Sequence, residues 1–146
     1  MSQFQTPESI CKYMVNLLPH GVKTVLEPTA GDGNIVKVLH GYSVTAPVDF
    51  WMTGGRFDAV VMNPPFTPMS EGYRIFFKCL EMSDVVIALM PWLTIINSGN
   101  RTRRIIEYGL KSVTHLPRNT FKGSRVQTCV LEMARGFNGV SKFMAL

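Results

Sequence analysis

The sequence predicts an α/β fold in which a central sheet is covered by helices on both faces, giving three layers. Short apolar segments of strand length alternate along the chain with segments whose apolar residues recur at helical spacing. The composition, 46% hydrophobic and 17% charged residues, is that of a globular domain and not of a disordered chain. No internal repeat, low-complexity tract or linker divides the 146 residues, so we expect a single domain over residues 1–146.

The first predicted element is a helix that begins after Gln5. Thr6 is the expected N-cap, Pro7 occupies the first helical position, and Glu8 places an acid in the first turn. An apolar stripe follows at helical spacing: Ile10, Met14, Leu17 and Leu18. The helix is expected to end near Pro19, which cannot continue it.

Six segments after this helix have the length and apolar character of strands. They are residues 22–26, 43–48, 57–62, 85–90, 111–116 and 128–133. Helical spacing predicts helices between them, at residues 35–39, 70–82 and 100–108. Only a polar, basic loop separates the last two strands, and it is too short to hold a crossover helix. We therefore expect these two strands to form an antiparallel pair at the edge of the sheet.

Basic residues concentrate near the end of the chain. The net charge is +5, but residues 1–100 carry six Lys/Arg against eight Asp/Glu, whereas residues 101–146 carry nine against two. A basic segment on a near-neutral body favours a polyanionic partner, because neutralised phosphates release counterions. A solvated charged face is the alternative, since charge asymmetry alone does not identify a partner.

Several classes of function find no support in the sequence. The longest apolar run, residues 85–92, is too short to span a bilayer, and no secretory pattern opens the chain. We therefore expect a cytoplasmic protein without membrane contact. Cys11, Cys79 and Cys129 lie far apart and are expected to be buried, reduced thiols. Neither these cysteines nor the three histidines have metal-ligand spacing, so no metal site is expected.

A glycine-rich turn, residues 27–33 (EPTAGDG), follows the first predicted strand. Glycines at this position let a cofactor approach the backbone closely, and the turn leads into a helix N-terminus that favours negative groups. Glu27, at the end of the strand, is well placed to hold a cationic amino group. The spacing is not the GxGxxG of dinucleotide sites, and many strand-to-helix turns use glycine without binding a cofactor.

The most specific motif is Asn63-Pro64-Pro65-Phe66, directly after the third predicted strand. The prolines stiffen the loop, so that the Asn63 side-chain oxygen and the Pro64 carbonyl can point at one amine. An aromatic amine such as N6 of adenine is a poor nucleophile, because its lone pair is delocalised into the ring. Accepting both of its hydrogens in a tetrahedral arrangement would free the lone pair for attack on a methyl donor. Phe66 could stack on the ring, although a rigid loop with a buried phenylalanine is the plain alternative.

In these motifs the sequence resembles the N6-adenine-specific DNA methyltransferases, which take a methyl group from S-adenosylmethionine. Four segments carry the resemblance in the family's order: residues 4–10 (FQTPESI), 27–33 (EPTAGDG), 63–66 (NPPF) and 118–123 (RNTFKG). The resemblance covers roughly residues 4–135. It implies a Rossmann-like class I S-adenosylmethionine-dependent methyltransferase fold, shortened in the middle.

The resemblance also implies which residues hold the cofactor and the base. Thr6 would bind the carboxylate of S-adenosylmethionine and Glu27 its amino group. The turn would pass under the ribose and methionine through Pro28, Ala30, Gly31, Asp32 and Gly33. The base would be held at N6 and on both faces by the tetrapeptide and the late loop: Asn63, Pro64, Pro65, Phe66 and Phe121.

The cofactor half departs from the family's pattern. Between the glycine turn and the catalytic loop, the family has a complete second strand, a helix and a third strand, whose acids hold the ribose and adenine of the cofactor. Here only residues 34–62 are available, and a single acid, Asp49, stands beside Phe50 before the catalytic strand. Asp49 follows Gly33 by 16 residues, near the offset of a ribose acid, whereas its Asp-Phe context resembles the adenine-binding step. Because one acid replaces two, we expect weak cofactor binding.

The family's DNA enzymes usually carry a target-recognition domain, and only about two dozen residues follow the last motif loop. The resemblance therefore predicts a compact, phage-type relative of restriction-modification enzymes, with specificity that is loose or supplied by a specificity subunit or a second copy. Basic side chains are expected to hold phosphates: Arg118, Lys122 and Arg125 in the late loop, with Arg101, Arg103 and Arg104. Because flipping costs least when a base is unpaired, single-stranded DNA is the expected substrate.

Other functions stay open at this point. Adenine in structured RNA poses the same chemical problem. A glutamine amide of a protein does too, but enzymes of that kind usually end the tetrapeptide with Tyr, where this chain has Phe66, and carry a separate N-terminal helical domain. A catalytically degenerate nucleic-acid-binding or regulatory subunit would account for the shortened middle, although the intact tetrapeptide argues against it.

Overall fold

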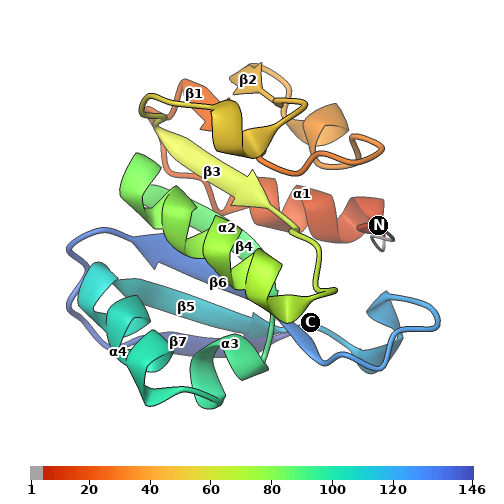
Figure 1. Ribbon diagram of the computed structural model, residues 1–146, viewed down its shortest axis with the longest axis vertical. Coiled ribbons are helices and arrows are strands. Elements are labelled where there is room, and N and C mark those ends of the chain that lie inside the picture. Colours follow the sequence, from red (N-terminus) through yellow and green to blue (C-terminus); the bar gives the residue numbers. More distant parts are fainter. Residues whose placement is uncertain (1–4) are drawn as a thin grey trace.

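The computed structural model of the protein describes residues 5–146, in which one sheet of seven strands forms the centre (Figure 1). The strands are β1 (Thr24–Leu26), β2 (Ser43–Thr45), β3 (Ala59–Met62), β4 (Val85–Pro91), β5 (Leu110–His115), β6 (Thr128–Ala134) and β7 (Lys142–Ala145). Their order in the sheet is β2-β1-β3-β4-β6-β5-β7. The first four are mutually parallel, β6 is antiparallel to both β4 and β5, and β7 is parallel to β5.

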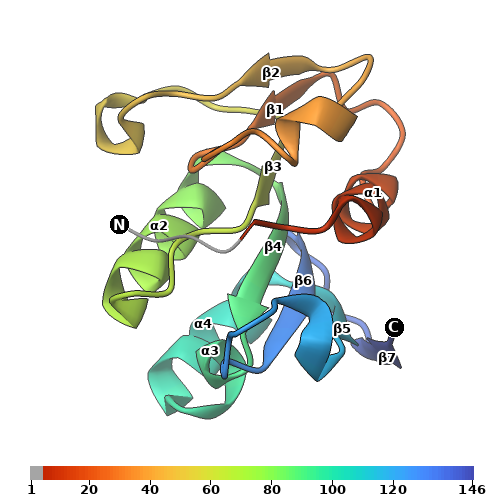
Figure 2. The ribbon, with the colours of Figure 1, turned by 90° about the vertical axis from the view of Figure 1, so that its right-hand side faces the viewer.

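Helices cover both faces of this sheet (Figure 2). The α-helices are α1 (Glu8–Asn16), α2 (Met69–Met82), α3 (Leu93–Ile96) and α4 (Gly99–Tyr108). Three short 3-10 turns complete the structure: η1 (Val36–Val38), η2 (Phe50–Met52) and η3 (Arg118–Thr120). Helices α2, α3 and α4 lie on one face and α1 lies on the other.

The core is divided by the sheet into two clusters, because successive residues of a strand point to opposite faces. In β3, Val60 and Met62 belong to the cluster under α2, whereas Ala59 and Val61 belong to the cluster under α1. All four are fully buried, as parallel strands covered on both sides must be. The predicted α/β fold with three layers is therefore confirmed.

The start of α1 differs from the prediction. The helix begins at Glu8 with Pro7 as its N-cap and no side-chain cap, and the amides of Ile10 and Cys11 donate to the Pro7 carbonyl. The prediction that Thr6 caps the helix is therefore wrong. The Thr6 hydroxyl oxygen instead accepts a hydrogen bond from the Asn63 side chain.

The segment between β1 and β3 is shorter in regular structure than predicted. The helix expected over residues 35–39 is the single 3-10 turn η1, and the strand expected over residues 43–48 ends at Thr45. Phe57 makes only an isolated bridge to Ser83, so β3 begins at Ala59. The segment is short, and most of its residues form the turns that return the chain to the sheet.

At the end of the chain, the predicted antiparallel pairing of β5 and β6 is confirmed. The pair is not outermost, however, because β7 adds to β5 as a further, unpredicted strand. All four residues of β7 are exposed, so no burial pattern marks them in the sequence. Helix α3 was not predicted either, because four residues are too short for a periodic signal.

The three cysteines are buried free thiols, as expected. Burial raises the pKa of Cys11 to about 11 and that of Cys129 to about 12, so both stay protonated near neutral pH. Within residues 5–146, every helix is too short or too polar to cross a bilayer.

Candidate active site

The two motif-bearing strands are neighbours in the sheet. β1 and β3 pair in parallel, so Glu27, just after β1, and Asn63, just after β3, emerge at the same edge. In open parallel sheets, ligands bind outside the carboxyl ends of the strands. The edge that carries both motifs is thus the candidate site.

Asn63 is bonded to both of the other N-terminal motifs. Its side-chain amide donates from Nδ2 to the Thr6 hydroxyl oxygen at 2.7 Å, and its backbone carbonyl accepts from the Thr29 hydroxyl at 3.3 Å. Asn34 donates from Nδ2 to the Thr6 carbonyl at 3.1 Å, and the Cys11 thiol contacts the same carbonyl at 3.6 Å. Three segments far apart in the sequence are therefore joined by hydrogen bonds at Asn63 and Thr6.

These contacts involve residues that sequence reasoning assigned differently or missed. Thr6, which is expected from the sequence to hold a cofactor carboxylate, is 4% exposed, and its hydroxyl oxygen accepts from the Asn63 side chain. Thr29 and Asn34 were not singled out, although they lie within and directly after the glycine-rich motif. Phe4, the first residue of the leading motif, lies outside the described residues.

Glu27 is an acid buried at the site, with 1% of its surface exposed. The backbone amide of Thr29 donates to its Oε1 at 2.8 Å. Desolvation dominates over this hydrogen bond and raises the pKa of Glu27 to about 8. A buried carboxyl of this kind gains most from a cationic partner, because the partner would stabilise the charged form that burial disfavours.

The turn after Glu27 presents bare backbone. Gly31 and Gly33 have φ angles of 55° and 84°, which side-chain-bearing residues rarely adopt. A Cβ at Gly33 would meet no atom within 4 Å, so there is open space over this part of the turn. Pro28 is buried beneath it, whereas Asp32 is exposed.

Asp49, the acid expected to contact the ribose or adenine of the cofactor, forms its hydrogen bonds within its own turn. Asp49 is exposed, and its Oδ1 accepts from the Trp51 amide at 3.0 Å, which caps η2. Phe50 is buried in the cluster under α2, with its ring 5.0 Å from that of Trp51. Trp51 in turn donates to Glu71 of α2 at 3.2 Å, so this turn is attached to α2.

The tetrapeptide is firmly packed. Asn63, Pro64 and Pro65 are buried, and Phe66 is half-buried against the cluster under α1. Helix α2 supports the loop from the other side at Gly72, where a Cβ would lie 2.6 Å from the Pro65 carbonyl oxygen. A glycine inside a predicted helix is a signal of such a close approach.

We expect Gly72→Ala to displace the tetrapeptide and to lower the free energy of unfolding by about 1–3 kcal/mol, as overpacking does. Equilibrium urea unfolding measures this. Gly99→Ala at the start of α4 is the matched control, since its Cβ would meet nothing within 4 Å and should be neutral or slightly stabilising. Equal stabilities for the two variants would contradict the close contact.

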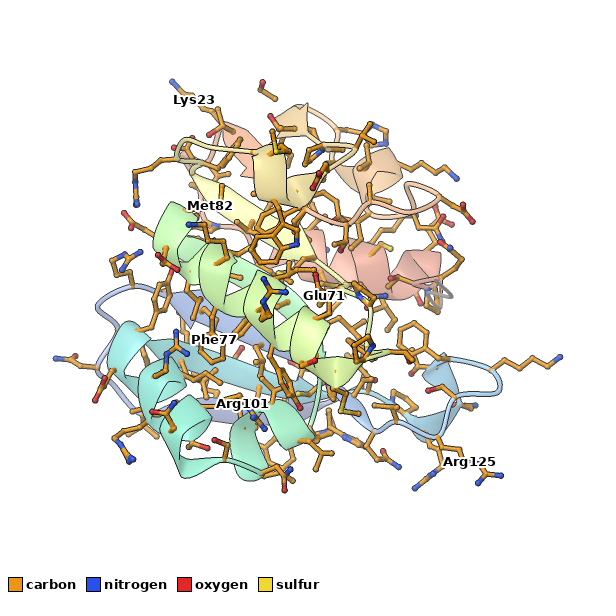
Figure 3. The ribbon with its side chains drawn as sticks, in the orientation of Figure 1. Lys23, Glu71, Phe77, Met82, Arg101 and Arg125 are labelled. Atoms are coloured by element: carbon orange, nitrogen blue, oxygen red, sulfur yellow. The ribbon has the colours of Figure 1, made fainter. Side chains whose placement is uncertain are left out.

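The late loop is divided between core and surface. Phe121 is 6% exposed and belongs to the cluster under α1, against which Phe66 also packs. Arg118, Lys122 and Arg125 are exposed, and Arg125 points outward from the loop (Figure 3). The loop therefore combines a buried aromatic side chain with three solvent-facing cations.

Next to this loop, at the carboxyl end of β4, is an apolar hollow of about 620 Å³. Its lining includes Met69, three residues after Phe66, together with Trp92, His115 and Arg125. Trp92 donates from Nε1 to His115 Nδ1 at 2.9 Å, which holds the indole ring in place. The hollow is large and apolar enough to receive an aromatic ring.

Several solved structures with a similar fold are described as methyltransferases or as modification subunits. A methyltransferase subunit of a type I restriction-modification system from Streptococcus thermophilus matches 97% of this chain with a TM-score of 0.77 and 16% identity. A modification subunit described for a type I restriction enzyme of Vibrio vulnificus matches 99% with a TM-score of 0.74 and 16% identity. A protein of Listeria monocytogenes described as a class I S-adenosylmethionine-dependent methyltransferase matches 97% with a TM-score of 0.73 and 13% identity.

The chain spans 47% of each of the first two proteins and 65% of the third. No protein-family model and no curated protein matches its sequence. At these identities the likeness concerns the fold, and it confirms the expected class I methyltransferase fold.

Proposed function

We propose that the protein is an S-adenosylmethionine-dependent methyltransferase that acts on the N6 amine of adenine in DNA. The observation that carries the proposal is the bonding of Asn63 to Thr6 and Thr29, at the sheet edge where Glu27 is buried. This arrangement joins the tetrapeptide to the two motifs that the resemblance assigns to the cofactor.

The residues at the end of β1 fit the proposed cofactor. Glu27 would hold its ammonium group, and the open backbone at Gly33 would lie against its methionine and ribose portion. When bound, S-adenosylmethionine supplies an electrophilic methyl group on a positively charged sulfur. Asp49 is exposed and accepts a hydrogen bond within its own turn. It remains the candidate for contact with the nucleoside end of the cofactor.

The tetrapeptide would activate the target nitrogen. Nδ2 of Asn63 donates to Thr6, which orients the amide, and Oδ1 is the acceptor atom of this side chain that would face the amine. With the Pro64 carbonyl as second acceptor, N6 would be held with both hydrogens bonded and its lone pair directed away from the ring. This preorganised pair of acceptors requires no strong general base.

The base would be contacted by Phe66, which is half-buried, and by Phe121, which is more deeply buried in the cluster against which Phe66 packs. Stacking of a base on an aromatic ring contributes about 1–3 kcal/mol. Arg118, Lys122 and Arg125 would bind phosphates without reading sequence. Loose specificity, or a partner subunit that supplies it, follows from this assignment.

Digestion of treated nucleic acid to nucleosides, with mass detection of the products, tests the proposal. The protein is incubated with S-adenosylmethionine and mixed-sequence DNA, single-stranded or duplex, and in parallel with RNA. We expect N6-methyldeoxyadenosine. N6-methyladenosine from the RNA arm alone would keep the chemistry and change the substrate, and no methylated nucleoside from any arm would overturn the proposal.

A nucleic-acid-binding subunit without transferase activity is the second candidate. It is favoured by the reduced segment between β1 and β3, in which Asp49 bonds its own turn and η1 replaces a full helix. Binding of DNA without incorporation of labelled methyl groups would support it.

A further inference from the structure

A groove between α2 and α4 combines basic and aromatic side chains. It has a volume of about 430 Å³ and lies on the face opposite α1, where Figure 3 shows Phe77 and Arg101. Its cations are Arg74 and Lys78 of α2 and Arg101 and Arg104 of α4. Its aromatic residues are Trp51, Tyr73 and Phe77. Trp51 adjoins Asp49 of the candidate site, and Arg101 and Arg104 are among the cations expected from the sequence to hold phosphates.

Each of the three arginines is held over an aromatic ring. The guanidinium carbon of Arg74 lies 4.7 Å from the Trp51 ring centre, that of Arg101 4.1 Å from Tyr73, and that of Arg104 3.9 Å from Phe77. A stacked guanidinium keeps its N–H donors in the plane of the group, where they can still bind a phosphate. Stacking therefore orders the cations before any ligand arrives.

Positive charge predominates in the groove. Glu81 is the acid that lines it, and Glu71, also on α2, pairs with Arg74 at 2.9 Å. Within the described part of the chain, Lys78 and Arg104 form no ion pair with an acidic side chain. Two exposed cations thus remain available to a polyanion.

The groove starts beside the tetrapeptide. Ser70, four residues after Phe66, lines one end and Glu81 lines the other. At 1.5 Å per helical residue these positions are about 16 Å apart along α2, which matches about five stacked nucleotides at 3.4 Å each. A strand with one base at the tetrapeptide could therefore continue along α2.

We propose that this groove binds the sugar-phosphate backbone of the single-stranded nucleic acid that flanks the target base. A basic groove that tracks the backbone, with aromatic side chains beside it, is the arrangement by which single strands are bound without sequence preference. The inference rests on the proposed function for the identity of the target base, but backbone binding can be measured without methyl transfer.

The test is the salt dependence of binding to a fluorescein-labelled 20-nucleotide oligothymidine, which contains no adenine. Each phosphate contact contributes about 0.7 to the slope of log K against log salt for single strands. We expect the double variant Lys78→Gln/Arg104→Gln to lower the magnitude of the slope by about 1.4 and to weaken binding at 50 mM salt at least tenfold. Each single variant should lower it by about half as much, which covers the case in which the double variant unfolds.

The matched control is Lys111→Gln/Lys142→Gln, which removes the same charge at exposed positions outside the groove. We expect its slope to remain that of the unmodified protein. An unchanged slope in the groove variants, or an equal loss in the control, would overturn the inference and would leave the groove to an acidic protein partner or to general charge attraction. Absence of methylated nucleosides would instead contradict the proposed function, and it would not affect the conclusion on backbone binding.

Discussion

Replacing Asn63 by alanine should strongly lower the rate of methyl transfer while leaving the protein folded. The variant removes the Oδ1 acceptor proposed for N6, and loss of one preorganised hydrogen-bonding group costs about 10²–10³-fold in kcat. It also removes the bond from Nδ2 to Thr6, but Thr6 keeps the contacts to its carbonyl from Asn34 and Cys11. Single-turnover incorporation of labelled methyl groups into DNA measures the effect. Asn138→Ala, at an exposed position, is the matched control and should retain full activity. Activity in Asn63→Ala within threefold of the unmodified protein would refute the assignment.

The role of Thr6, the partner of Asn63 in this hydrogen bond, can be tested separately. If the Thr6 hydroxyl positions Asn63, then Thr6→Val should lower kcat about tenfold, with KM for S-adenosylmethionine little changed, and Thr6→Ser should restore kcat. A role on the cofactor carboxylate, as the family resemblance implies, would raise the KM for S-adenosylmethionine instead. The split between kcat and KM therefore distinguishes the two roles.

The parallel half of the sheet could be predicted because its strands are continuous apolar runs. Val60, Val61 and Met62 are buried on both faces, and such runs are read directly from a sequence. β7 could not be predicted, because its residues are exposed and it exists through pairing with β5. The prediction of a helix at residues 35–39 was wrong for a related reason. Its apolar residues pack against α1 and the sheet in a single turn, and helical spacing alone does not reveal so short a segment.

The position of the candidate site could be predicted, but not its bonding. The order of the motifs and the parallel pairing of β1 with β3 are enough to bring Glu27 and Asn63 to one edge. The contact between Thr6 and Asn63 spans 57 residues of sequence, and capping of α1 was a competing use of the same hydroxyl. Gly72 is intermediate, since a glycine in a helix indicates close packing but not the Pro65 carbonyl as the neighbour.

Glu27→Gln should alter the pH dependence of stability in a defined window. The ordinary pKa of this carboxyl is 4.5 and burial raises it to about 8, so between these values the folded protein holds a proton that the unfolded chain has lost. The raised pKa of Glu27 therefore contributes its full stabilisation of the folded state below pH 4.5. This contribution is lost as the pH rises through about 8. Since a tenfold change in proton affinity corresponds to about 1.4 kcal/mol, the loss amounts to at most about 5 kcal/mol. Urea unfolding of both proteins from pH 5 to 9 should show the unmodified protein losing stability relative to Glu27→Gln, and parallel pH profiles would contradict a buried acid with a raised pKa.

The same proton should control cofactor binding. Holding the ammonium group requires the carboxylate form of Glu27, so affinity for S-adenosylmethionine should rise nearly tenfold per pH unit below about 8. Above that pH the ligand's own amino group, with a pKa of about 8, loses its charge, and affinity should fall again. Calorimetry is thus expected to give a maximum near pH 8 for the unmodified protein. Glu27→Gln should bind more weakly at the maximum and lack the rise on the acid side, because its side chain has no proton to lose. A rise of the same steepness in Glu27→Gln would assign the titration to another group and remove Glu27 from the cofactor's amino end.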